Sequence, residues 1–380
     1  MNDTLNQQFP LQDHLVYLNH AAVGPWPSCT SEAVIQFAEQ NTQRGATDYL
    51  QWLKVENRLR IQLRQLINAK SSDEIALVKN TSEAISIVAY GLTWQHGDNI
   101  VSSNQEFPSN RIPWQSLAEQ GVEFRMADLD SGNTPEQALF DMCDQHTKLL
   151  TISSVQYASG LKLDLIKIGQ FCRDKNILFC VDAIQSLGAH PFDVQQIQAD
   201  FVMADGHKWM LGPEGLALFY CRKPLIDTLK LNQYGWHMVE AIGDYNQQQW
   251  QPASSARRFE CGSPNMLAIH ALHSSLGLLL GIGIDQLTRQ LNERIDYLIE
   301  RIEQHPKLTL ISPSDTERRA GIVTFRHHDI DAETLYGALM KADVICAARG
   351  GGVRFSPHFY TPLEKIDVAF QRLDSCIISG

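Results

Sequence analysis

The strongest constraint on the fold is a repeated alternation of short apolar runs with longer amphipathic stretches. The apolar runs cover residues 75–78, 99–103, 122–126, 149–154, 177–181, 201–204 and 216–220. Between them lie segments with helical spacing, such as 83–90 and 165–174. Strands that alternate with helices predict a mostly parallel sheet covered by helices on both faces. In such a sheet, ligands collect at the carboxyl ends of the strands.

The pattern changes near residue 257. Two long helical stretches, a strand, a helix and two more strands are expected at 266–280, 286–305, 321–325, 332–340, 344–347 and 353–356. A chain of 380 residues is also too long for one compact core. We therefore predict a large α/β domain over residues 15–260 and a smaller α+β domain over residues 261–380.

Composition excludes several classes of partner. The net charge is −11 and basic residues form no run longer than a pair, which argues against a nucleic-acid partner. The first ten residues are polar and do not resemble a signal peptide. The most apolar window, 276–284, is too short to cross a bilayer. These features predict a cytoplasmic protein with no membrane partner.

The positions of the cysteines and histidines argue against a metal site. The eight cysteines form no Cys-x-x-Cys pair, and Cys180 and Cys221 lie within apolar strands. This usage is typical of reduced thiols in a core. Of the 13 histidines, the adjacent pair His327 and His328 would point to opposite faces of a strand. We expect no metal site.

One lysine and one aspartate stand at the ends of successive apolar strands. Lys208 follows the strand at 201–204 in a tight turn, and Asp182 ends the strand at 177–181. A lysine at the edge of a buried strand loses solvation, so its amine deprotonates more easily and can attack a carbonyl. A lysine for a Schiff base and a carboxylate for the pyridine nitrogen are what a pyridoxal 5'-phosphate (PLP) site requires.

At these residues the chain resembles the class V aminotransferase family of fold-type I PLP-dependent enzymes. That family includes cysteine desulfurases, selenocysteine lyase, kynureninase and isopenicillin N epimerase. The resemblance runs from residues 17–22 to residues 353–360, and the Asp-x-x-Gln and Gly-His-Lys motifs in this order make it specific. It implies the fold-type I architecture, an amino-acid substrate, and an N-terminal segment, residues 1–14, that packs on the small domain.

The turn at residues 80–85 follows a strand and opens a helix, which makes an anion site. The resemblance places the PLP phosphate on Thr81 and Ser82, with His207 as a further donor. A structural alternative is a capping box with Thr81 or Ser82 as the cap, and both roles are compatible. Asp205 stands where relatives often have serine; a carboxylate beside a phosphate is unfavourable, so we expect Asp205 to turn away.

Phe107 and Gln156 would contact the cofactor from two further segments. Phe107 matches the position whose ring stacks on PLP, where desulfurases have histidine; phenylalanine stacks but transfers no proton. The alternative is a core phenylalanine before a turn. Gln156 matches the Asn or Gln near the cofactor hydroxyl and the substrate carboxylate.

The segment after Asp182 supplies two more expected contacts. Gln185 would hydrogen-bond the phenolic oxygen of PLP, and Ala183 is small enough to lie beneath the ring. For Asp182 itself, the alternative to the cofactor role is a helix cap after a strand. The presence of Gln185 and Lys208 after it favours the cofactor role.

Two distant segments complete the predicted site. Arg354 matches the arginine that binds the substrate α-carboxylate, a role suited to a planar bidentate donor. Arg349 is either a site residue or a surface charge. Residues 258–265 resemble the segment that reaches the partner subunit's site, where Ser263 would touch the phosphate. This implies a homodimer with shared active sites.

The favoured function is an aminotransferase or a side-chain (Cβ) lyase, in which Lys208 holds PLP and then moves the α-proton. Cysteine desulfurase or selenocysteine lyase is the alternative. Desulfuration needs a mobile cysteine just before the carboxylate-binding arginine, and residues 347–352 have none, while Cys346 ends a strand. A non-catalytic PLP-fold binding protein is disfavoured because Lys208, Asp182 and Arg354 are all present. A nicotinamide enzyme is disfavoured because no Gly-x-Gly-x-x-Gly follows an early strand.

Overall fold

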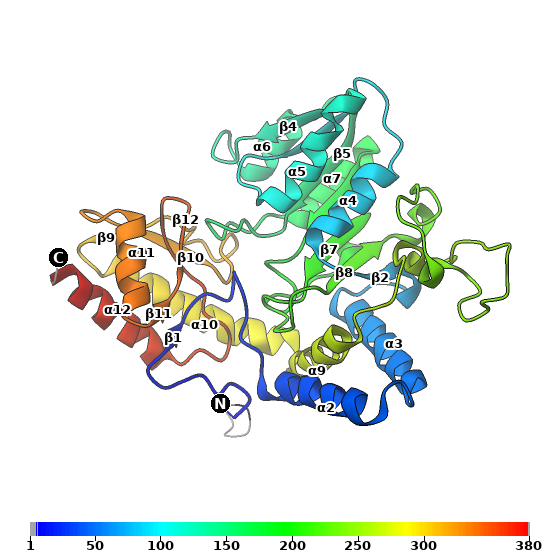
Figure 1. The fold of residues 1–380 in the computed structure, drawn as a ribbon. Helices are drawn as coiled ribbons and strands as arrows, with labels where there is room; N and C mark the ends of the chain where they lie inside the picture. Colours follow the sequence, from blue (N-terminus) through cyan, green and yellow to red (C-terminus); the bar gives the residue numbers. More distant parts are fainter. Residues whose placement is uncertain (1–4, 6, 379–380) are drawn as a thin grey trace.

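A seven-stranded sheet forms the centre of the larger of two lobes in the computed structural model, which describes residue 5 and residues 7–378 (Figure 1). The strand order is β2-β8-β7-β6-β5-β3-β4. Their bounds are β2 Ile75–Val78, β3 Asn99–Ser103, β4 Glu123–Ala127, β5 Thr147–Ser153, β6 Leu178–Asp182, β7 Phe201–Asp205 and β8 Ala217–Cys221. All neighbouring pairs from β4 to β7 are parallel, and β8 is antiparallel to both of its neighbours. The predicted, mostly parallel sheet is confirmed.

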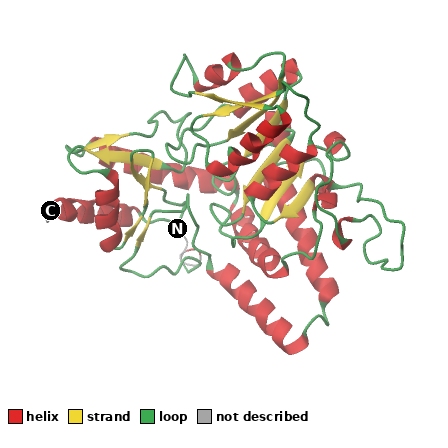
Figure 2. Ribbon diagram, turned by 45° about the horizontal axis from the view of Figure 1, so that its top comes forward, coloured by secondary structure: helices red, strands yellow, loops and turns green. Residues whose placement is uncertain are grey.

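Helices cover both faces of this sheet (Figure 2). The helices of this lobe are α2 Ser28–Arg44, α3 Tyr49–Leu66, α4 Thr81–Gly91, α5 Ile112–Gln115, α6 Pro135–Asp141, α7 Leu165–Lys175, α8 Val194–Ile197 and α9 Met266–Ile282. Alternate residues of β7 belong to different cores. Met203 packs with Ile85 of α4, whereas Val202 packs with the cluster that contains Ile168 of α7. Burial on both faces explains why the strands are continuously apolar.

The smaller lobe is built on a four-stranded antiparallel sheet of order β12-β13-β10-β9. Its elements are α10 Ile284–Glu303, β9 Leu308–Leu310, β10 Val323–His327, α11 Ala332–Lys341, β11 Val344–Ile345, β12 Ala347–Arg349, β13 Gly352–Phe355 and α12 Leu363–Ile378. The N-terminal strand β1, Val16–Tyr17, pairs in parallel with β11. The Phe9 ring stacks on Tyr360 with centroids 3.6 Å apart. Phe9 and β1 therefore contact the smaller lobe.

Most expected elements lie within a few residues of the observed ones, although β9 was not expected. The passage between the lobes falls at Gly283, where α9 and α10 bend by 83°. α9 packs against α2 and α3 of the large lobe, whereas α10 packs against β9 and α12 of the small one. The predicted domain boundary at 260/261 stays a prediction, as does the packing of residues 1–14, of which 1–4 and 6 lie outside the described residues.

A buried ion cluster ties α3 to the segment before α9. The two terminal guanidinium nitrogens of Arg60 donate to Glu260, Nη1 at 2.5 Å and Nη2 at 2.7 Å. Nη2 also donates to Glu56 at 2.5 Å. Glu260 also accepts a hydrogen bond from the backbone N–H of Leu77 in β2. His237 Nδ1 lies 3.6 Å from Glu260. Glu56, His237 and Glu260 are close enough to share a cation, but Arg60 already places a positive charge between the two carboxylates.

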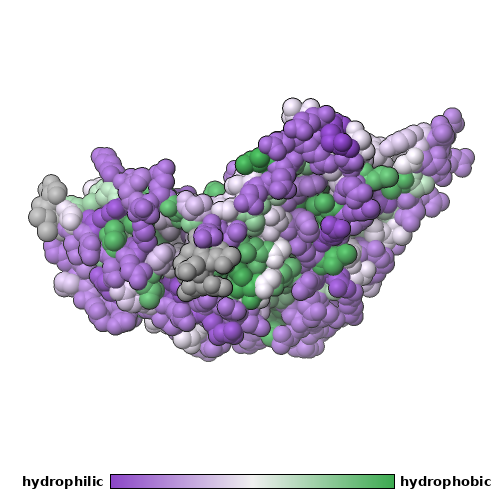
Figure 3. Space-filling view, turned by 90° about the horizontal axis from the view of Figure 1, so that it is seen from below, coloured by the Kyte–Doolittle hydropathy of each residue, from purple (hydrophilic) through white to green (hydrophobic). Residues whose placement is uncertain are grey.

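The surface seen from below is mostly hydrophilic, with apolar residues in small groups (Figure 3). Within the described residues, no single helix is both long enough and apolar enough to cross a membrane.

Candidate active site

A cavity of about 260 Å³ lies at the carboxyl ends of β6 and β7. Its walls come from the strand ends, from the beginning of α4, and from the β12–β13 hairpin of the small lobe. The lining residues are Ala21, Ala22, Asn80, Thr81, Ser82, Phe107, Ser109, Tyr157, Asp182, Ile184, Gln185, Asp205, His207, Lys208, Arg349 and Arg354. The structure thus brings together most of the residues singled out in the sequence, at the expected edge of the sheet.

Lys208 follows β7 and is only 9% exposed. Burial lowers the pKa of its amine to about 8, even though nearby Asp182 favours the charged form. Its Nζ lies 5.7 Å from the centroid of the Phe107 ring, which is 41% exposed at the cavity. A buried amine with a lowered pKa is a competent nucleophile toward an aldehyde.

Asp182 ends β6 and is 2% exposed. One carboxylate oxygen accepts a hydrogen bond from the backbone N–H of Ile184 at 3.0 Å, so it also caps the following turn. Burial raises the pKa of Asp182, and Lys208 opposes this rise. A cation placed beside this carboxylate would lower its pKa again.

The phosphate end of the predicted site is the first turn of α4. The capping prediction was wrong in its residue: Asn80 caps the helix by accepting from Glu83 N at 2.8 Å. The side chains of Thr81 and Ser82 are therefore not used as caps. Thr81 Oγ1 accepts from Asp205 N at 3.1 Å, and Ser82 Oγ donates to Ser109 Oγ at 2.9 Å.

Asp205 does not turn away from the cavity as expected. It lines the cavity, and its Oδ1 lies 2.9 Å from His207 Nδ1. The two atoms lie at ion-pair distance but make no hydrogen bond within the described part of the chain. His207 therefore lines the cavity beside Asp205.

Gln185 is fixed by two hydrogen bonds. Its Oε1 accepts from Trp209 Nε1 at 2.8 Å, and its Nε2 donates to Ala21 O at 3.0 Å. The amide has a second N–H, which is available at the cavity wall. Ala183, predicted beneath the ring, is completely buried and is not a lining residue.

Gln156 is completely buried behind the cavity wall rather than lining it. Its Nε2 donates to Glu106 Oε1 at 2.8 Å. Glu106 also accepts from Ser153 Oγ and from Asn110 Nδ2 at 2.5 and 2.7 Å. Sequence analysis gave Glu106 no role; its position directly before Phe107 was the only available signal. Glu106 holds the orientation of Gln156.

Arg354 is 3% exposed and lies on β13. Its guanidinium donates to Tyr157 O at 2.7 Å and to Asn19 Oδ1 at 3.3 Å, both uncharged acceptors. Arg349, at the end of β12, also lines the cavity. Arg349, which the sequence assigns either to the site or to the surface, therefore lies at the site.

Ser263 is a predicted cofactor residue that lies outside this cavity. It is exposed and lines a separate cavity of about 650 Å³, which reaches Asn80 at the start of α4.

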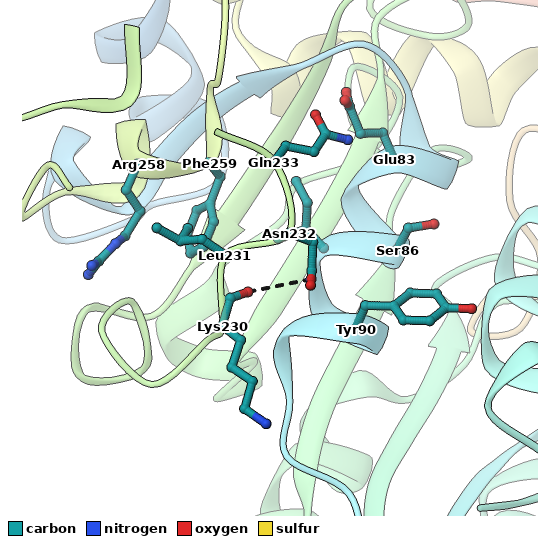
Figure 4. Close-up of a pocket in the computed structure, with 10 residues that line it drawn as sticks. Glu83, Ser86, Tyr90, Lys230, Leu231, Asn232, Gln233, Arg258 and Phe259 are labelled. Carbon is teal, nitrogen blue, oxygen red and sulfur yellow. Dashed lines mark hydrogen bonds between the residues drawn. The ribbon is translucent and has the colours of Figure 1, made fainter. Parts of the chain in front are cut away.

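A third cavity, of about 270 Å³, lies beside α4 (Figure 4). Its lysine, Lys230, is exposed and points away from the side chains around it. That cavity offers no buried lysine paired with a carboxylate.

The residues of the Lys208 cavity fit PLP. Four buried side-chain atoms in or near its walls have no hydrogen-bond partner within the described part of the chain: Gln156 Oε1, Asp205 Oδ1, His207 Nδ1 and Arg354 Nε. Asp182 is a buried carboxylate that a pyridinium nitrogen would stabilise, and a helix N-terminus with two hydroxyls suits a phosphate. Fold and site together define a PLP-dependent enzyme of fold type I.

Comparison with known proteins gives the family. Residues 16–367 match the model of the family described as Aminotransferase class-V, so the chain belongs to that family. It is 31% identical to a probable cysteine desulfurase of Methanothermobacter thermautotrophicus, over 96% of this chain and 95% of the relative. It is 30% identical to a cysteine desulfurase of Pectobacterium carotovorum, over 93% of this chain and 91% of the relative.

Solved structures support the same fold. The apo cysteine desulfurase of Thermococcus onnurineus superposes with a TM-score of 0.88 at 22% identity, over 100% of this chain and 99% of the other. A complex of the cystine C-S lyase C-DES with cysteine persulfide also gives a TM-score of 0.88 at 22% identity, over 97% and 99%. The predicted fold type and family are confirmed.

Proposed function

We propose that this enzyme transforms an amino acid as an aminotransferase or as a side-chain (Cβ) lyase, with Lys208 as its catalytic residue. The observation that carries the proposal is one cavity with a buried lysine of lowered pKa, a buried carboxylate and a buried arginine that has only uncharged partners. When bound, PLP supplies an electron sink for the electrons of the substrate α-carbon.

Each residue of the cavity would have a role that follows from its position. Thr81, Ser82 and His207 would hold the phosphate, Asp182 the pyridine nitrogen and Gln185 the phenolic oxygen. Phe107 would stack on the ring. Ala183 would lie beneath the ring, and Gln156 would act near the substrate carboxylate with Glu106 holding its amide.

Substrate binding would centre on Arg354, whose planar guanidinium suits a carboxylate. Lys208 would accept the α-proton at Nζ, because burial keeps a large fraction of its amine neutral near pH 8. Phe107 offers no group that could move a second proton.

Cysteine desulfuration is the second candidate, favoured by the names of the relatives at about 30% identity. Against it stands the β12–β13 hairpin, whose two-residue turn Gly350–Gly351 carries no cysteine. Cys346 lies just before β12 and is 2% exposed, and burial raises its thiol pKa to about 12. A buried, protonated thiol is a poor sulfur acceptor.

The proposed assembly is a homodimer with shared active sites. Ser263 is exposed on the segment between Glu260 and α9, and exposed aromatic residues precede it: Tyr234, Trp236, Tyr245 and Trp250. Such side chains favour burial against another surface.

The proposed location is the cytoplasm, in keeping with eight free cysteines.

The test is absorbance of the purified, PLP-loaded protein mixed with single amino acids, without an oxo-acid acceptor. A visible band of lysine-bound PLP that bleaches with one stoichiometric burst of oxo acid supports transamination. Continued product release with the band retained supports a lyase. If cysteine is the only amino acid that reacts, and the products are alanine and transferred sulfur, the enzyme is a cysteine desulfurase and the proposal is wrong. If no band appears after PLP is added, the role of Lys208 is wrong.

A further inference from the structure

Arg349 and Arg354 lie on one face of a tight hairpin. β12 and β13 are antiparallel, with Ala347 opposite Arg354 and Arg349 opposite Gly352. Directly opposed residues, and residues two apart on one strand, share a face. The two arginines are therefore diagonal neighbours on the face opposite to Val353, which packs in the core.

Glycines make this arrangement possible. Gly350 and Gly351 have φ of 59° and 75°, the positive values that a two-residue hairpin turn requires. Gly352, opposite Arg349, has no room for a side chain, because a Cβ there would lie 2.3 Å from Phe325 O. The residue opposite Arg349 therefore has to be glycine, and it adds no side chain to this face of the hairpin.

Both positive charges lack an acidic partner in the described chain. Arg354 donates to Tyr157 O and Asn19 Oδ1, and Arg349 donates to Ala348 O, all uncharged acceptors. Burial, and then the positive charge of Arg349, lowers the pKa of Arg354 to about 10. Arg354 thus feels the positive charge of Arg349 without a carboxylate to offset it.

The two acidic residues that line the cavity are already engaged elsewhere. Asp205 lies against His207, and Asp182 interacts with Lys208. A substrate with one carboxylate would neutralise only one arginine. A substrate with two acidic groups would neutralise both, since each guanidinium can bind a carboxylate or sulfinate through two N–H groups.

We propose that Arg349 selects substrates whose side chain ends in an acidic group, a carboxylate or a sulfinate, while Arg354 holds the α-carboxylate. This proposal rests on the proposed function, because it assigns the substrate class of the same cavity. Arg349 is the specificity-determining residue, and amino acids with neutral side chains of the same length are the disfavoured class.

Binding of unreactive acids to the PLP-loaded protein tests this without turnover. Calorimetric titration with succinate and glutarate is compared with titration with butyrate, which lacks the second carboxylate. The dicarboxylates should bind about tenfold more tightly, the gain expected of one charge-assisted interaction. Arg349→Gln should reduce this ratio to near one, and Arg349→Lys should retain part of it.

Arg326→Gln is the matched control, because Arg326 is exposed on β10 of the same sheet. It should keep the wild-type ratio. Equal affinity for butyrate and the dicarboxylates in the wild type, with the visible band present, would overturn the proposal and leave the proposed function intact. An unchanged ratio in Arg349→Gln would overturn it too. Absence of the band would instead indicate that the proposed function fails.

A second readout uses amino acids. Aspartate, glutamate and cysteine sulfinate should perturb the visible band of bound PLP at lower concentrations than asparagine, glutamine and cysteine. The preference should disappear in Arg349→Gln and persist in Arg326→Gln. Preference for the neutral members of each pair in the wild type would contradict the assignment.

Discussion

The indole of Trp209 holds the side chain of Gln185, with Nε1 donating to Oε1 at 2.8 Å. Because the carbonyl oxygen faces Trp209, the amide nitrogen must face Ala21 O and the cavity. Trp209 is completely buried and directly follows Lys208 in the chain. The residue after the lysine therefore sets which end of the Gln185 amide meets the cofactor.

Trp209→Phe should weaken PLP binding by roughly tenfold, since it removes one of the two hydrogen bonds that fix this orientation. The measurement is the PLP dissociation constant, followed by the visible band. Trp94→Phe, which removes an indole hydrogen bond to Ala89 O outside the cavity, should leave the constant unchanged. Wild-type affinity in Trp209→Phe would show that Gln185 needs no such support.

Lys208→Ala should abolish the visible band and lower turnover by on the order of 10³-fold or more, as expected when a base and nucleophile is lost. Lys230→Ala is the control, because Lys230 is an exposed lysine at the third cavity (Figure 4). Spectra and rates are measured on both variants. A retained band in Lys208→Ala would place the reactive amine elsewhere.

Much of the fold and the centre of the site could be predicted from the sequence. Asp182 and Lys208 were placed at strand ends because their strands are apolar throughout, which follows from burial on both faces of the sheet. The edge of the sheet then follows from the direction of parallel strands. These inferences depend on local patterns only.

Contacts between distant segments could not be predicted in the same way. The Thr81 hydroxyl accepts a hydrogen bond from Asp205 N, 124 residues away. The hydrogen bond from Gln156 to Glu106 likewise joins residues that are 50 apart in the sequence. Such pairings depend on tertiary packing, which sequence spacing does not encode.

The reaction of PLP with the cofactor-free protein should depend on pH through Lys208. Only the neutral amine attacks an aldehyde, and its pKa is lowered to about 8. The rate of appearance of the visible band should rise with pH and level off above about pH 8–9. The midpoint, measured by stopped-flow absorbance, should lie well below that of an exposed lysine.

Asp182→Asn should shift this midpoint to lower pH. The negative charge of Asp182 raises the pKa of Lys208, so its removal leaves burial and the positive charge of Arg354 to lower that pKa further. A midpoint that moved to higher pH would contradict the pairing of the two side chains. Asp128→Asn, at an exposed loop, is the control and should leave the midpoint in place.

Arg60→Met should destabilise the fold by about 3–5 kcal/mol, because it leaves two buried carboxylates, Glu56 and Glu260, without their cation. The matched control is Arg44→Met, which removes an exposed ion pair with Asp48 and should cost far less stability. Denaturant unfolding gives both values. Similar losses in the two variants would mean that the Arg60 cluster contributes no more than a surface ion pair.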